Sequence, residues 1–153
     1  MMKCAIAIIA FLSLATVASA SEVILPSQEL SPQEVIRIQL SALQQNSTDM
    51  PSAGIEQTWA FAHPKNRAVT GPIERFEQML KNKNYQCLLG HKEHRIQEVV
   101  VTPEIANYQV LIVSSDDKKF SFYWRLERVT EGPFTGSWMT TGVSTPQRAK
   151  DAV

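Results

Sequence analysis

The densest group of chemically capable side chains in the sequence is the stretch Cys87-Leu88-Leu89-Gly90-His91-Lys92-Glu93-His94. A thiol, imidazoles and a carboxylate are ligands that zinc and copper accept. The spacing matches no standard motif, and within one strand His91 and His94 would point to opposite faces. A metal-handling alternative needs a loop at Gly90 that brings Cys87, His91 and His94 within reach of one ion. We therefore predict no metal and no other cofactor.

A second polar group is the corner Pro64-Lys65-Asn66-Arg67, which precedes a helix expected to open at Thr70-Gly71-Pro72. The Arg67 guanidinium and the free amides of that helix could hold an anion or a carboxylate. The candidate binding residues are Trp59, Asn66, Arg67 and Thr70. The alternative, which we favour, is structural: Asn66 and Arg67 tie the loop to the sheet and Thr70 caps the helix.

The elements that position these groups follow an N-terminal secretion signal. Met1-Met2-Lys3 is a short basic start, Cys4–Val17 is an uncharged apolar run, and Ala18-Ser19-Ala20 is a cleavage signal. The run is too short to span a bilayer, which needs about 20 apolar residues. We expect residues 1–20 to be removed, the protein to be secreted to the periplasm or the extracellular space, and no membrane span to remain.

The mature chain has the size and charge of one ordinary domain. It keeps 133 residues and, because only Lys3 is lost among the charged residues, 14 basic against 15 acidic side chains. Near-neutrality argues against a nucleic-acid partner, which needs a basic face. Cys87 is then the only cysteine, so no internal disulfide can form, and a buried thiol is the favoured role.

Three helices are expected after an extended lead at residues 21–30. Ser31-Pro32-Gln33-Glu34 combines a capping box with proline at the first helical position, and an apolar stripe continues to about Gln45. A second helix is predicted over Ser52–Ala62, and a third runs from Pro72 to about Lys83.

The period then changes to that of strands. The stretch 120–129 alternates, with Phe120, Phe122, Trp124 and Leu126 on one face. Further strands are predicted over 85–89, 95–102, 107–114 and 136–143, and residues 146–153 form a polar tail. Helices followed by an antiparallel meander indicate an α+β domain over residues 31–145, with the helices packed on a curved sheet that forms a cone.

Two pieces of sequence carry a resemblance to a known superfamily. They are Trp59-Ala60-Phe61-Ala62-His63-Pro64-Lys65-Asn66-Arg67-Ala68-Val69-Thr70-Gly71-Pro72, followed by Arg75-Phe76, and the closing Gly136-Ser137-Trp138-Met139-Thr140-Thr141-Gly142-Val143. With the element order, they resemble the nuclear-transport-factor-2-like cone superfamily, which includes SnoaL-like and ketosteroid-isomerase-like proteins. Within it they resemble an uncharacterised branch from bacteria and plastids. The resemblance implies a cone fold and does not choose an activity.

The superfamily's isomerase chemistry needs a carboxylate base and a hydrogen-bond donor inside an apolar cone. The aspartates fall in a loop, a hairpin tip and a tail, so we predict no catalytic site. The candidates for an isomerase- or hydrolase-like alternative are Glu56, His63 and Tyr123. We expect instead a non-enzymatic domain that binds a small apolar or amphipathic ligand in the cone, or that dimerises through the sheet face bearing Gln109, Tyr123, Arg125 and Glu127.

Overall fold

The computed structural model describes residues 22–46 and 52–149. The predicted signal peptide lies outside the described residues, as do positions 47–51 and the end of the predicted polar tail. Among the residues described, no helix is long and apolar enough to cross a membrane.

The chain is an α+β structure in which the helices precede the sheet, as predicted. The helices are α1 (Pro32–Gln44), α2 (Ala53–Ala60), α3 (Pro64–Thr70) and α4 (Ile73–Lys81), followed by a 3₁₀ turn η1 (Gln86–Leu88). The strands are β1 (Glu93–Val101), β2 (Ile105–Val113), β3 (Lys119–Arg128), β4 (Trp138–Val143) and the short β5 (Gln147–Arg148).

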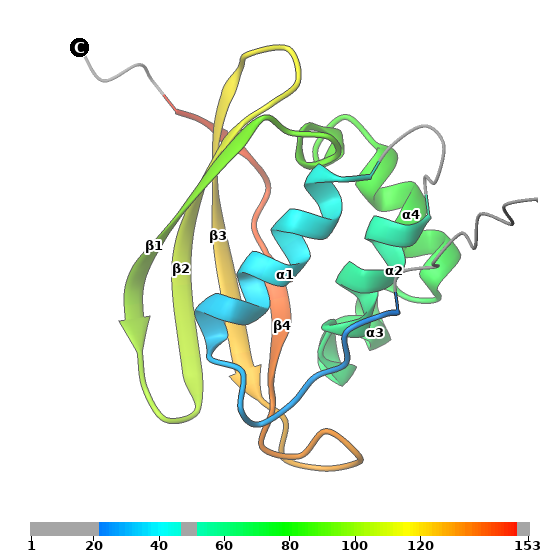
Figure 1. The fold of residues 1–153 in the computed structure, drawn as a ribbon, viewed down its shortest axis with the longest axis vertical. Helices are drawn as coiled ribbons and strands as arrows, with labels where there is room; N and C mark the ends of the chain where they lie inside the picture. The colour runs from blue at the N-terminus through cyan, green and yellow to red at the C-terminus, as the bar shows by residue number, and fades with distance from the viewer. Residues whose placement is uncertain (1–21, 47–51, 150–153) are drawn as a thin grey trace, which may run out of the picture.

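The sheet is an antiparallel meander in the order β1-β2-β3-β4. The first residues of the predicted polar tail form β5, which pairs with the start of β3. Figure 1 shows the helices on one side of the sheet, with α1 between the sheet and α2. The opposite face of the sheet carries no helix layer in the described part of the chain.

The capping box at the start of α1 forms as predicted. The Glu34 amide donates to Ser31 Oγ at 3.3 Å, and the Ser31 amide donates back to the Glu34 carboxylate at 2.8 Å. Pro32 occupies the first helical position, where its missing N–H costs nothing. The apolar stripe of α1 is fully buried against the sheet and α2; its members are Val35, Ile36, Leu40 and Leu43.

Strand β3 confirms the predicted alternation. Phe122, Trp124 and Leu126 are buried on the helix side, while Tyr123 and Arg125 are exposed on the other side. The neighbouring strand β2 repeats the pattern, because Tyr108, Val110 and Ile112 lie opposite the apolar residues of β3. One face of this antiparallel pair therefore forms the sheet side of the hydrophobic core.

The helix α3 was not predicted. The sequence indicated a polar corner at Pro64–Arg67, but the corner is one turn of a seven-residue helix. His63 Nδ1 accepts from the Lys65 amide at 3.1 Å and caps its start, and Pro64 follows at the first helical position. No residue of α3 is buried, so the helix leaves no apolar periodicity in the sequence.

The strand predicted over 85–89 is wrong. Gln86–Leu88 forms the 3₁₀ turn η1, which follows a turn in which the Asn84 amide donates to the Asn82 side chain at 2.9 Å. Short apolar runs do not distinguish a strand from a buried turn, because both place two or three apolar side chains inward.

Candidate functional site

The described residues line a partly open cavity of about 70 Å³ between the helices and the sheet. Its walls come from α1, α2, α3, α4, η1, β3 and β4. The apolar lining residues are Leu43, Phe76, Met79, Leu80, Leu88, Trp124 and Val143. The polar lining residues are Thr58, Asn66, Thr70, Tyr85 and Thr140. None of these carries a formal charge, so the cavity suits a neutral molecule with an apolar body and a hydrogen-bonding group.

A buried polar network lies beside the cavity and was missed in the sequence. The side-chain oxygen of Gln39 accepts from Thr140 Oγ1 at 2.7 Å and from Trp124 Nε1 at 3.3 Å. Its amide nitrogen donates to the Thr58 carbonyl oxygen at 3.0 Å. The network joins α1, α2, β3 and β4, so it fixes the spacing of the cavity walls.

One signal could have revealed this network. Gln39 lies within the apolar stripe of α1, between Ile36 and Leu40, and a glutamine there must be buried with partners. Neither Thr58 nor Thr140 stands out in the same way, because threonines at such positions are common.

The predicted binding residues separate into two groups. Asn66 and Thr70 line the cavity, and the Thr70 hydroxyl donates to the Asn66 carbonyl oxygen at 2.9 Å. Asn66 Nδ2 donates to the Thr140 carbonyl oxygen at 3.2 Å, which ties α3 to β4. Thr70 ends α3 and caps no helix start, because the residue that precedes α4 is Pro72.

Arg67 and Trp59 hold the end of α2. Arg67 donates to the backbone carbonyls of Ala62 at 2.9 Å, Trp59 at 2.8 Å and Ala60 at 3.2 Å. The guanidinium also lies over the Trp59 ring, 5.0 Å from its centroid. Partial burial lowers the pKa of Arg67 from its usual value. The guanidinium is thus engaged as a tie between helices, with three carbonyls as its partners.

The candidate catalytic residues do not meet. Glu56 is exposed on α2, and Tyr123 is exposed on the sheet face opposite the helices. His63 is buried at the start of α3, where its Nδ1 is occupied by the cap. Burial, then the Lys65 charge, lowers the pKa of His63. None of the three lines the cavity.

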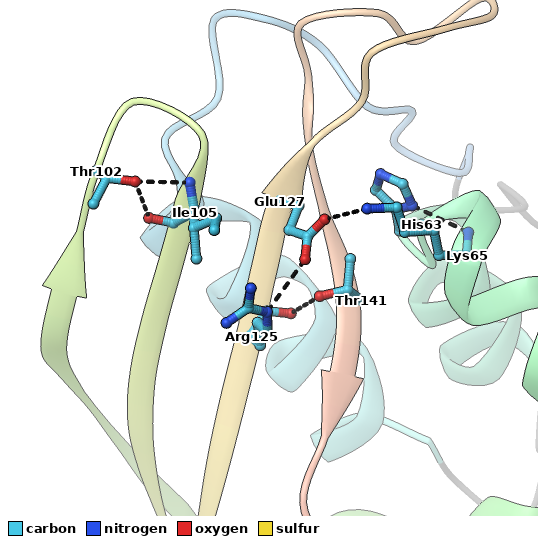
Figure 2. Close-up of polar contacts among 7 residues, drawn as sticks. All are labelled: His63, Lys65, Thr102, Ile105, Arg125, Glu127 and Thr141. Carbon is cyan, nitrogen blue, oxygen red and sulfur yellow. Dashed lines mark hydrogen bonds and ion pairs between the residues drawn. The ribbon is translucent and has the colours of Figure 1, made fainter.

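A charge cluster covers part of the outer sheet face, near His63 (Figure 2). Glu127 on β3 pairs with Lys65 of α3 at 2.7 Å and with Arg125 at 3.2 Å. The hydrogen bond from Lys65 is the largest cause that lowers the pKa of Glu127. These pairs attach α3 to the outer side of β3, and the side chain of Lys65 is mostly exposed.

The metal candidates converge only in part. The positive φ of Gly90 turns the chain so that His91 Nε2 and His94 Nδ1 lie 2.8 Å apart. Cys87 is half-buried, and burial raises the pKa of its thiol. Residues 22–46 and 52–149 contain no group of three or more histidine, cysteine or acidic side chains placed to hold a metal ion. We assign none of the three as a metal ligand.

Comparison with protein families gives one match. A family model described as Domain of unknown function (DUF4864) matches residues 27–153, which cover the whole described domain apart from its first residues. Searches of curated proteins and of solved structures gave no significant match.

Proposed function

The chain belongs to the DUF4864 family, and we propose that it is a non-enzymatic binding domain for a small neutral ligand held in the central cavity. The observation that carries this proposal is the cavity itself. It combines an apolar wall with uncharged polar groups from α2, α3 and β4 and from Tyr85, which precedes η1, and this is the usual composition of a ligand site.

The size of the cavity limits which ligands can fit. At about 70 Å³ it is half the size of the roughly 150 Å³ engineered cavity that binds benzene. The ligand is therefore a molecule of few atoms, or a larger amphipathic one that inserts a narrow apolar end. The uncharged polar groups of Asn66, Thr70 and Tyr85 are placed to orient it.

The enzymatic alternative is an isomerase- or hydrolase-like site in the same cavity. It requires an acid or base among the lining residues. Glu56 and His63 lie elsewhere, and the tyrosine that lines the cavity, Tyr85, donates to the Val143 carbonyl oxygen at 3.3 Å. Burial raises the pKa of Tyr85, which favours its neutral, donating form. This arrangement supports binding over catalysis.

A retained ligand tests the proposal. Native mass spectrometry is performed on the protein purified from its own secretory compartment, as wild type, Val143→Phe and Val113→Phe. Val143 lines the cavity, whereas Val113 lies on β2 outside it. We expect a bound neutral molecule on wild type and Val113→Phe, and none on Val143→Phe. A ligand-free wild type, or the same ligand on all three proteins, would contradict the proposal.

A second candidate is self-association through the outer sheet face. The observation that favours it is Tyr123, which is 51% exposed between Gln109 and Arg125 on a face without a helix layer. A face that mixes an aromatic side chain with both charges can be self-complementary about a two-fold axis. We expect a concentration-dependent dimer in analytical ultracentrifugation that Tyr123→Glu abolishes and Val69→Glu, on exposed α3, preserves. A strict monomer at high concentration would exclude this candidate.

The wider assignment is part of the proposal. Helices that precede an antiparallel meander and cover one face of it support placement in the nuclear-transport-factor-2-like superfamily, with a curved, cone-shaped sheet. The basic start, apolar run and Ala18-Ser19-Ala20 support secretion to the periplasm or the extracellular space. A mature N-terminus at Ser21, measured on the exported protein, would establish the cleavage.

A further inference from the structure

A pair of histidines lies behind the part of the cavity wall that η1 forms. His91 is 2% exposed, and its Nδ1 lies 2.7 Å from the carbonyl oxygen of Leu88. Its other nitrogen, Nε2, lies 2.8 Å from Nδ1 of His94, and the two rings meet edge to face. Both nitrogens of a buried imidazole are therefore in hydrogen bonds.

These contacts fix where the protons are. A carbonyl oxygen only accepts, so His91 Nδ1 carries a proton and donates to Leu88. In the neutral ring the opposite nitrogen, Nε2, is then unprotonated and accepts, so His94 Nδ1 must be the donor. The neutral pair thus has one allowed arrangement, with the remaining nitrogen of His94 free of a proton.

The pair accepts one extra proton but not two. The first can bind to the free nitrogen of His94, and the hydrogen bond between the rings survives. A second would have to bind His91 Nε2, which would place two N–H groups against each other 2.8 Å apart between two positive rings. The contact must then break. The two imidazoles titrate as a coupled pair, and the second step is the disruptive one.

The surroundings oppose this second proton. Burial is the main cause that lowers the pKa of both His91 and His94, and the Arg37 charge on α1 further lowers that of His94. The carboxylates of the β2–β3 hairpin pair with lysines: Asp116 with Lys118, and Asp117 with Lys92. On η1 the titratable group is the Cys87 thiol, whose pKa is raised, so it stays neutral in acid. The charged residues that adjoin His94 on the same strand are Glu93 and Arg95.

The pair is connected directly to the cavity. Leu88, whose carbonyl His91 holds, is 1% exposed and lines the cavity, as does Tyr85 at the start of η1. The next residues are anchored to α1, because the Gly90 amide donates to the Leu43 carbonyl at 2.9 Å and Leu43 also lines the cavity. Breaking the histidine contact removes the tie that runs from the Leu88 carbonyl of η1 through His91 to His94 on β1, and leaves the hydrogen bond to Leu43 as the anchor of this turn.

We propose that double protonation of the His91–His94 pair opens η1 and weakens ligand binding in the central cavity, which makes the site acid-releasing. The release of ligand rests on the proposed binding function, whereas the opening of η1 does not. A secreted domain that meets acidic surroundings would then bind at neutral pH and release in acid.

Amide hydrogen exchange tests the opening. It is measured by NMR for the amides of Leu88 and Leu89, which donate within η1 to Tyr85 and Gln86, between about pH 7 and about pH 4.5 and corrected for intrinsic rates. As the pH falls from the ordinary pKa of a freed histidine toward the lower pKa of the closed pair, the open state binds one more proton than the closed state, and we expect the opening constant to rise by up to about tenfold per pH unit.

The variant His94→Asn removes the conflict but keeps a partner. The Asn amide nitrogen can take the place of His94 Nδ1 as donor, and its oxygen can accept after a flip when His91 is protonated. In this variant we expect the opening constant measured at the Leu88 amide to change less than about threefold over the same pH range. Linkage to one proton would change it by about tenfold per pH unit. The matched control is His63→Asn, which changes a buried histidine at the start of α3 and should keep the wild-type pH dependence.

Equal pH dependence in wild type and His94→Asn would overturn the proposal. If the variant does not fold, the ¹⁵N chemical shifts of the wild-type imidazoles report when both rings are protonated. A doubly protonated pair in which the Leu88 amide is still protected from exchange would also overturn the proposal.

Xenon, which enters apolar cavities, reports ligand release. We expect it to shift the methyl signals of Leu43, Leu80 and Leu88 at neutral pH and not in acid. No xenon shift at neutral pH would count against the proposed cavity function, while the exchange data would still decide the switch.

Discussion

The two faces of strand β3 differ in the burial of their side chains and in the partners of their polar groups. On the helix side, Phe122 and Trp124 are buried, and Trp124 shares its indole hydrogen bond between Gln39 and Thr140. On the other side, Tyr123 and Arg125 are exposed and the charges pair only at the surface, with Glu127 and through it Lys65. Alternate residues of one strand thus belong to two different environments, and substitutions in them should differ by several kcal/mol.

The largest expected effect separates two neighbouring residues. Phe122→Ala removes a fully buried ring that stacks near Tyr85, and should lower the free energy of unfolding by about 3–5 kcal/mol. Tyr123→Ala on the exposed face should change it by no more than about 0.5 kcal/mol. Urea unfolding followed by tryptophan fluorescence measures both. Similar losses in the two variants would mean that the outer face is covered in solution.

The buried polar network should have the next largest effect. Gln39→Leu keeps a side chain of similar size but removes the acceptor of the Thr140 hydroxyl proton and one of the two donors to the Thr58 carbonyl, at a cost of about 1–3 kcal/mol. The control is Gln44→Leu on the same helix, which loses one exposed hydrogen bond to the Lys92 carbonyl and should cost about 1 kcal/mol or less. Equal costs in a urea titration would show that the network adds nothing to the stability of the core.

The start of α1 should have a smaller effect. Ser31→Ala removes the acceptor for the Glu34 amide and should destabilise the domain by about 1 kcal/mol. Ser31→Asp keeps an N-cap acceptor, so thermal unfolding should show a lower Tm for the alanine variant than for the aspartate variant. The same Tm for both would show that the cap does not limit the stability of α1.

The outer charge cluster should have the smallest effect. Lys65→Met breaks the ion pair to Glu127 but leaves Arg125 beside it, and should change the free energy of unfolding by about 0–1 kcal/mol. The difference from wild type should shrink further at high salt, because exposed pairs are screened. A loss above 2 kcal/mol would assign α3 a larger role in holding the sheet than its exposed pairs predict.

The structural features that were predicted correctly from the sequence depend on local residue patterns. The capping box at Ser31 and Glu34, the apolar stripe of α1 and the alternation of β3 each follow from residues a few positions apart, and each is confirmed. The two elements that were missed or assigned wrongly have the opposite character. Helix α3 has no buried residue to produce a period, and the run at residues 85–89 is too short to distinguish a 3₁₀ turn from a strand.

The candidate site was less predictable because it is assembled from distant parts of the chain. Asn66 and Thr70 were recognised as polar groups before a helix, but that they face a cavity with Tyr85 and Thr140 depends on how β4 meets α3. Arg67, chosen as an anion ligand, is engaged by carbonyls at the end of α2. Asn66 and Arg67 both lie in α3, and because this helix has no buried residue, the sequence has no apolar period that would show which of the two faces inward.

The sequence by itself determined the α+β order of the elements, the face of β3 that is buried and the start of α1, because these depend on interactions within a few residues. Only the tertiary structure decided that Gln39 links Trp124 to Thr140, 101 positions from Gln39, and that His91 meets His94 beside the cavity wall. The first contact joins α1 to the sheet, and the second depends on the left-handed turn at Gly90. Contacts of both kinds arise only when the whole chain has packed, because packing chooses among the turns and side-chain orientations that the local sequence allows.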